Sequence, residues 1–102
     1  MESVPTVGEG TVVSPDGDLN EVTAASLRQE LNQLVAGGRR EIVVDLARVR
    51  DMDAFGLGVL CAAQTTLNRE KGSFSVINAS PEVETLLRRT GLSRHVSIST
   101  AE

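Results

Sequence analysis

The sequence predicts an α/β fold, in which helices pack on a sheet. Two observations predict it. Stretches rich in β-branched residues alternate along the chain with stretches whose apolar residues recur every three or four positions. Glycine, proline or a capping residue stands at most of the boundaries between them. Strands that alternate with helices of this length are typical of crossover connections within one sheet.

Length and composition favour one soluble domain spanning residues 1–102. Apolar residues make up 40% of the 102, enough for a core that must be aliphatic, since Phe55 and Phe74 are the only aromatics. A net charge of −4 offers no basic field for nucleic acid or anionic lipid. A single cysteine, Cys61, and a single histidine, His95, argue against a disulfide or a metal site. No leader peptide and no apolar stretch of about 20 residues is visible, so we expect a cytoplasmic protein without cofactor or metal.

The first third of the chain is expected to contain two short strands and a helix. Val4 to Val7 suits an edge strand, where Pro5 is tolerated, and Thr11 to Ser14 suits a second strand. Asn20 suits the N-cap of a helix that Gly37 and Gly38 end. The apolar stripe of this helix is formed by Ala24, Leu27, Leu31 and Leu34.

The middle of the chain is expected to form a strand and a second helix. Ile42, Val43 and Val44 are a continuous apolar run, which is the pattern of a strand covered on both faces. The helix should begin just after Asp53 and end around Lys71. Its predicted inner side is formed by Leu57, Leu60, Cys61, Gln64 and Leu67.

The last third is expected to add a strand, a third helix and a short final strand. Phe74 to Asn78 form the first of these strands. Ser80 and Pro81 suit the N-cap and first turn of a helix that Gly91 ends. The apolar face of this helix is formed by Val83, Leu86 and Leu87. His95 to Ser99 is the final strand.

No catalytic site is predicted. Cys61 falls on the expected inner side of a helix, where a small buried thiol is the commoner role. His95 has no recognisable partner in the sequence. Asp51 and Asp53 point different ways because they are two residues apart, and an Asp that precedes a helix is usually its cap. We therefore expect a protein that is not an enzyme.

The segment DMDAFGLGVL, residues 51–60, is the main candidate for a functional surface. It leads into a helix N-terminus, whose free N–H groups favour anionic groups such as a phosphorylated side chain. Gly56 and Gly58 supply only two of the three glycines of a dinucleotide fingerprint, and no P-loop is present. The glycines are expected instead to let the helix begin close against the sheet. Neither Ala54 nor Phe55 carries a hydroxyl that could accept phosphate.

Three segments, in the right order, resemble the STAS domain family, which includes anti-sigma factor antagonists and the cytoplasmic tails of sulfate transporters. GDLNEVTAASLRQEL resembles the Gly-Glu-Leu-Asp segment that enters the family's first helix. REIVVDLARVRDMDAFGLGVL resembles the central strand, the Asp-Ser-Ser-Gly-Leu-Gly loop and the second helix, and SPEVETLLRRTGL resembles the third helix. The resemblance covers nearly the whole chain. It implies a mixed sheet of four or five strands with helices mainly on one face.

Resemblance to anti-sigma factor antagonists implies a phosphorylation switch. A serine in the loop is phosphorylated by an anti-sigma factor that is also a kinase, of the histidine-kinase-like ATPase type, and phosphorylation breaks the complex of the two proteins. Aligned on Asp53 and on Gly56 to Gly58, the phosphorylated serine falls at Phe55 and the serine before it at Ala54. The implied partner-binding residues are Asp18, Asn20, Asp53, Ala54, Phe55, Gly56 and Leu57.

Three interpretations of Phe55 stay open. The missing hydroxyl locks an antagonist in its binding-competent state, the ring anchors a partner, or the ring folds back over Met52 or Leu57 and has no partner. The first two are compatible. Other hydroxyls could accept phosphate, although capping or turn roles explain them, namely Thr23, Ser14 and Ser80.

The predicted function is that of a regulator resembling an anti-sigma factor antagonist, which binds an anti-sigma factor and serine kinase in partner switching. The alternative is a STAS subunit of an ABC-type transport or lipid-trafficking complex, in which the same surface docks on an ATPase. A weaker alternative is a nucleotide-binding module. No pattern in the sequence indicates an oligomeric state.

Overall fold

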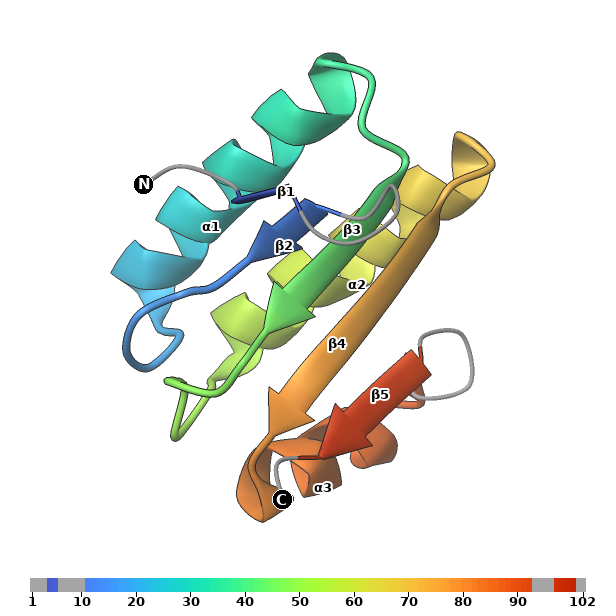
Figure 1. Ribbon diagram of the computed structural model, residues 1–102. Helices are drawn as coiled ribbons and strands as arrows, with labels where there is room; N and C mark the ends of the chain where they lie inside the picture. Colours follow the sequence, from blue (N-terminus) through green and yellow to red (C-terminus); the bar gives the residue numbers. More distant parts are fainter. Residues whose placement is uncertain (1–3, 6–10, 93–96, 101–102) are drawn as a thin grey trace.

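The computed structural model describes residues 4–5, 11–92 and 97–100. Within these ranges, strands and helices follow one another in the predicted order (Figure 1). The strands are β1 (Val4–Pro5), β2 (Thr11–Val13), β3 (Glu41–Asp45), β4 (Ser73–Ala79) and β5 (Ser97–Thr100). The helices are α1 (Glu21–Ala36), α2 (Ala54–Arg69) and α3 (Pro81–Arg89). The strand predictions for Val7 and His95 fall outside the described residues.

The described strands form one mixed sheet in the order β1-β2-β3-β4-β5. Strands β2 to β5 are parallel to their neighbours, and β1 pairs with β2 antiparallel at the edge. Register pairs Ile42 with Phe74 and Val44 with Val76. Because the strands are parallel, α1 and α2 both begin at the edge of the sheet where β2 and β3 end, and this brings two loops together there.

Helices cover one face of the sheet. Figure 1 shows α1 and α2 behind β2, β3 and β4, and α3 packs against β4 and β5. Ile42 and Val44 are 1% and 0% exposed, whereas Val43 between them is only half-buried. The prediction that this strand is covered on both faces is therefore wrong. Valine favours a strand even on a face that no helix covers. A run of three apolar residues therefore could not separate a strand covered on both faces from one covered on a single face.

The core between sheet and helices is aliphatic apart from Phe74, as the composition predicted. On α1, the predicted stripe is buried at Ala24, Leu27 and Leu31 and half-buried at Leu34. On α2, the buried residues are Gly56, Val59, Leu60 and Leu67. The predicted inner side of α2 is thus confirmed at Leu60 and Leu67. The other three residues predicted for it are only half-buried, namely Leu57, Cys61 and Gln64.

Each helix begins at the cap that was predicted for it. Asn20 caps α1, Asp53 caps α2, and Ser80 caps α3 with Pro81 in its first turn. After α1, Gly38 has φ of 96°, a backbone conformation that glycine adopts without the steric cost of a Cβ. These local features place the helix N-termini, and therefore the loops in front of them.

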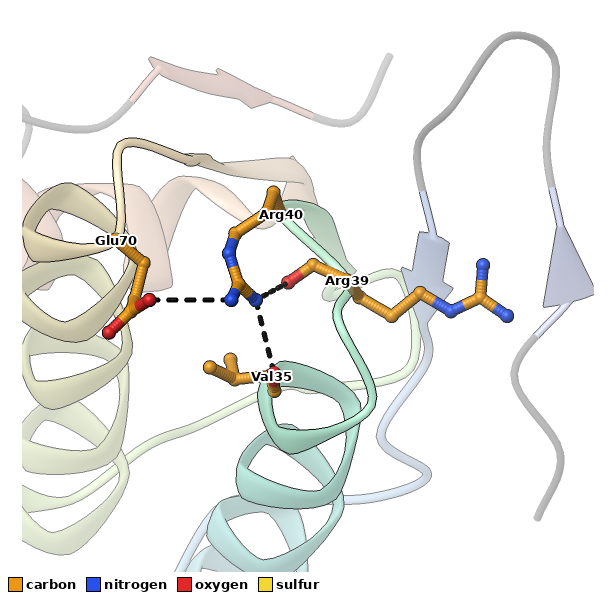
Figure 2. Close-up of polar contacts among 4 residues, drawn as sticks. All are labelled: Val35, Arg39, Arg40 and Glu70. Carbon is orange, nitrogen blue, oxygen red and sulfur yellow. Dashed lines mark hydrogen bonds and ion pairs between the residues drawn. The ribbon is translucent and has the colours of Figure 1, made fainter.

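Arg40, at the start of β3, joins the C-terminal ends of α1 and α2. Its guanidinium donates to the carbonyl oxygens of Val35 at 3.0 Å and Arg39 at 3.1 Å, and to the Glu70 carboxylate at 3.3 Å (Figure 2). Val35 lies in the last turn of α1, and Glu70 is the C-cap of α2. A cation near both helix C-termini also complements their dipoles. One side chain thus connects the ends of two helices, and it does so through a carboxylate 30 residues further along the chain.

Candidate functional site

Two loops meet in front of α1 and α2. The Leu19 amide donates to the Asp51 carbonyl at 3.1 Å, and the Asp53 amide donates to the Leu19 carbonyl at 3.0 Å. These bonds form a short parallel bridge between Leu19 and Met52, whose side chains are 1% and 5% exposed. The GDLN loop (residues 17–20) and the DMDA loop (residues 51–54) are therefore fixed to each other through their backbones, with two apolar side chains buried beneath them.

Asp18 adds a side-chain connection between the same loops. One oxygen of its carboxylate accepts hydrogen bonds from the amides of Arg50 and Asp51, each at 3.1 Å. A carboxylate that accepts backbone N–H groups forms stronger hydrogen bonds than a neutral acceptor does. Asp18, one of the implied partner-binding residues, is thus in direct contact with the loop before α2.

Two N-terminal amides of each of the helices α1 and α2 donate to a side chain of the chain itself. The Asp53 carboxylate accepts from the amides of Phe55 at 2.9 Å and Gly56 at 3.3 Å. On α1, Asn20 accepts from the Val22 and Thr23 amides, and the Thr23 hydroxyl accepts from the Asn20 amide at 2.8 Å. The predicted capping role of Asp53 is confirmed. It also means that anionic charge is already present at the start of α2.

The two glycines of α2 have different surroundings. A Cβ at Gly56 would lie 2.8 Å from both the Leu19 Cβ and the Met52 Cγ, so only glycine lets the helix approach the loops this closely. A Cβ at Gly58 would have no atom of the described part of the chain within 4 Å. Both glycines were expected to let the helix begin close against the sheet. Gly56 does allow a close approach, but to the Leu19–Met52 bridge outside the named strands. The expectation is wrong for Gly58, because Gly58 is on the exposed side of the helix.

Phe55 lies on the surface directly after the capping aspartate. Its side chain is 55% exposed, and among the described residues only Val22, at 74%, is another exposed large hydrophobic. Ala54, Asp53, Asn20 and Asp18 are exposed as well, whereas Gly56 is buried and Leu57 packs against the core. The exposed ring argues against the interpretation in which Phe55 folds back and is covered.

An open groove of about 540 Å³ runs between the N-terminal halves of α1 and α2, and Phe55 forms part of its wall. Its lining residues are Glu21, Ala24, Ala25, Arg28, Ala54, Phe55, Gly58, Val59 and Ala62. Toward the C-terminal halves the space between the helices narrows to a pocket of about 40 Å³. Sequence reasoning missed this groove. The small residues at four-residue spacing on α2, Ala54, Gly58 and Ala62, were the available indication.

The described residues contain no group of three or more potential metal ligands. Every buried side-chain nitrogen or oxygen in that part of the chain has a hydrogen-bond partner. No helix there is long and apolar enough to cross a bilayer. What the site presents is an apolar, partly grooved surface, bordered by carboxylates and supported by two loops.

Comparison with known proteins identifies the family of this chain. The family model described as "Mlab, STAS domain" matches residues 3–99. An anti-sigma-B factor antagonist of Staphylococcus aureus is 30% identical over 80 residues, which cover 78% of this chain and 74% of that protein. The chain belongs to the STAS domain family of anti-sigma factor antagonists.

Other members of the family agree in sequence and fold. An anti-sigma F factor antagonist of Paenibacillus polymyxa is 29% identical over 82 residues, which cover 79% of this STAS chain and 70% of that protein. A crystal structure of an anti-sigma factor antagonist from Mycobacterium paratuberculosis superimposes with a TM-score of 0.81 at 28% identity, covering 96% of this chain and 84% of the other. The implied fold, a mixed sheet with helices mainly on one face, is thereby confirmed.

Proposed function

We propose that this STAS domain, as one folded unit spanning residues 1–102, binds an anti-sigma factor and thereby releases a sigma factor. The exposed Phe55 ring carries the proposal, because it lies on the surface where the family resemblance places the phosphorylated serine. Asp18, Asn20, Asp53 and Ala54 surround it as further exposed contacts. Gly56 and Leu57 lie beneath this surface and support it.

The partner we propose is an anti-sigma factor that is also a serine kinase of the histidine-kinase-like ATPase type. In this chain, neither residue 54 nor residue 55 offers a hydroxyl for that kinase. The nearby Thr23 hydroxyl donates to the Asp18 carbonyl at 2.7 Å, and the Ser80 hydroxyl caps α3 at 3.2 Å from the Val83 amide. The antagonist is then constantly competent to bind, and its activity is set by its concentration.

Phe55 supplies the binding energy in this proposal. A phenylalanine that is buried completely removes about 150–250 Å² from water. Phe55 is 55% exposed, so a partner can still cover about half of that area, and aromatic residues are frequent hot spots of interfaces. A serine at this position contributes almost no apolar area. The replacement therefore removes a switch and adds an anchor at the same place.

The absence of a hydroxyl at residues 54 and 55 also favours a second candidate function. In a STAS subunit of an ABC-type transport or lipid-trafficking complex, the same surface docks on an ATPase and needs no phosphorylation. The two candidates share the surface and differ in the partner. Identifying the bound protein therefore separates them.

The first experiment is capture from the native host with the wild-type protein and with Phe55→Ala as bait, followed by mass spectrometry. A histidine-kinase-like anti-sigma factor that is retained by the wild type and lost with Phe55→Ala supports the antagonist. An ABC-type ATPase with the same behaviour supports the transport subunit. Equal recovery by both baits would contradict any role of Phe55.

The second experiment incubates the purified partner kinase and ATP with the wild type and with Phe55→Ser. We expect phosphate on Phe55→Ser at residue 55 and none on the wild type, measured by mass spectrometry of the intact proteins and their peptides. Phe55→Ser is the positive control, because it shows that the kinase is active. Stoichiometric phosphate on the wild type would overturn the locked state.

A further inference from the structure

The groove between α1 and α2 is built to leave space. Its α2 wall includes the small residues Ala54, Gly58 and Ala62, beside Phe55 and Val59. Glycine in a helix interior costs roughly 0.5–1 kcal/mol relative to alanine, and no atom of the described residues lies within 4 Å of a Cβ placed at Gly58. Any larger side chain at residue 58 would project into the groove. Gly58 thus lowers the helix propensity of α2 at a position where it helps to keep the groove wide.

The chemistry of the walls selects the kind of occupant. Both walls are flanks of α-helices, whose backbone groups are already hydrogen-bonded within the helix. An extended peptide would find no sheet edge to pair with and would leave its own backbone unsatisfied. A small molecule would find few converging polar groups. The backbone of a helix from a partner protein is already hydrogen-bonded within that helix. Such a helix can bury an apolar stripe between the alanines, beside Phe55.

The charges at the two ends of the groove define which helix fits. Glu21 lines the end near the two loops, where the exposed carboxylates of Asp18, Asp51 and Asp53 also lie. Arg28 lines the groove seven residues further along α1, which is about 10 Å along the helix axis. Neither Glu21 nor Arg28 takes part in an ion pair with another described residue. Both charges therefore stay available to a partner.

We infer that this groove binds an amphipathic helix of the anti-sigma factor. Small or aliphatic residues of that helix face Ala25, Gly58 and Ala62. A basic side chain lies near Glu21, and an acidic side chain about two turns away faces Arg28. The inference rests on the proposed function and extends it, since it names the element of the partner that the Phe55 surface receives.

Gly58→Leu tests the groove without disturbing the fold. Leucine fits the open space around residue 58 and is a better helix former than glycine, so thermal unfolding should occur at an equal or higher temperature. We expect the affinity for the purified anti-sigma factor, measured by calorimetry, to fall at least tenfold. Asn68→Leu is the matched control, because Asn68 is exposed on α2 and does not line the groove. Its affinity should stay within twofold of the wild type.

Charge reversal tests the identity and direction of the occupant. Arg28→Glu should weaken binding about tenfold, and an acidic-to-lysine substitution in the partner helix should restore most of the loss. A photo-crosslinking residue at Ala62 should label partner residues spaced three or four apart, as one face of a helix requires. Crosslinks to a second copy of this chain, or to an extended segment, would overturn the inference.

The outcomes also separate this inference from the function it rests on. If the anti-sigma factor binds the wild type and binds Gly58→Leu equally well, the groove is not its docking site and the proposed function still stands. If no anti-sigma factor binds the wild type, the proposed function fails and the inference fails with it.

Discussion

The two ends of the α1–α2 pair are built differently. At the C-terminal ends, Arg40 connects the Val35 carbonyl of α1 with the Glu70 carboxylate of α2, and the helices enclose only about 40 Å³ between them nearby. At the N-terminal ends, alanines and Gly58 line an open groove of about 540 Å³, with Phe55 exposed beside it. The closed end contributes stability, whereas the open end leaves surface for a partner. Substitutions at the two ends should therefore alter different measurements.

The largest effect is expected at Gly56, which lies at the open end but faces inward. Gly56→Leu should lower the free energy of unfolding by about 3 kcal/mol, because even its Cβ would lie 2.8 Å from Leu19 and Met52 atoms. Urea denaturation followed by circular dichroism measures the change. Gly58→Leu is the matched control, two residues away on the same helix. A loss at residue 58 as large as that at 56 would contradict the distinction between the two glycines.

Phe55 should affect binding rather than folding. Phe55→Ser should weaken the complex with the anti-sigma factor by about 2 kcal/mol or more, roughly thirty-fold, because the anchoring ring is lost. Its unfolding free energy should change by less than about 0.5 kcal/mol, as expected of a surface substitution. Titration calorimetry and urea denaturation give the two values. Val22→Ser is the control, since Val22 is also exposed but does not line the groove.

Arg40 should show the opposite behaviour. Arg40→Met should lower the free energy of unfolding by about 1.5 kcal/mol, mainly through the lost bonds to the Val35 and Arg39 carbonyls. The ion pair with Glu70 adds little, because the two side chains are 40% and 44% exposed. Partner affinity should not change. Arg40→Lys keeps the charge without the forked donor geometry and should lie between the wild type and Arg40→Met.

The smallest expected effect is a gain. Gly58→Ala should raise the free energy of unfolding by roughly 0.5–1 kcal/mol, since it removes the conformational cost of glycine and its methyl group would lie more than 4 Å from the neighbouring atoms that the structure describes. Thermal unfolding measures the gain. Because a methyl group takes little of the groove, partner affinity should fall much less than with Gly58→Leu. A destabilised Gly58→Ala would show that residue 58 has a packing role.

Features determined by neighbouring residues could be predicted from sequence, and those determined by distant packing could not. Asn20, Asp53 and Ser80 cap helices through atoms two or three residues away, so local pattern was enough to find them. Arg40 and Glu70 are 30 residues apart, and nothing in the sequence near either one indicates the other. The burial of Val43 depends on which face of the sheet the helices cover, and the residues next to Val43 do not indicate that face.

The candidate site divides in the same way. The DMDA segment was identified from the spacing of Asp53 and the glycines, aided by family resemblance, whereas the sequence left open whether the Phe55 ring is exposed. The groove was not predicted, because it exists only where the flank of α1 meets the flank of α2. Gly56 and Gly58 look equivalent in sequence, although one contacts Leu19 and Met52 and the other faces solvent.

The bridge between Leu19 and Met52 has a consequence for how this surface can change over time. The two loops are joined by backbone bonds and by the Asp18 carboxylate, and none of these involves the side chains of residues 54 and 55. A single codon change there can therefore exchange a hydroxyl for an aromatic ring while the scaffold stays the same. In such a protein, the gain or loss of kinase control is an evolutionary step separate from the origin of the fold.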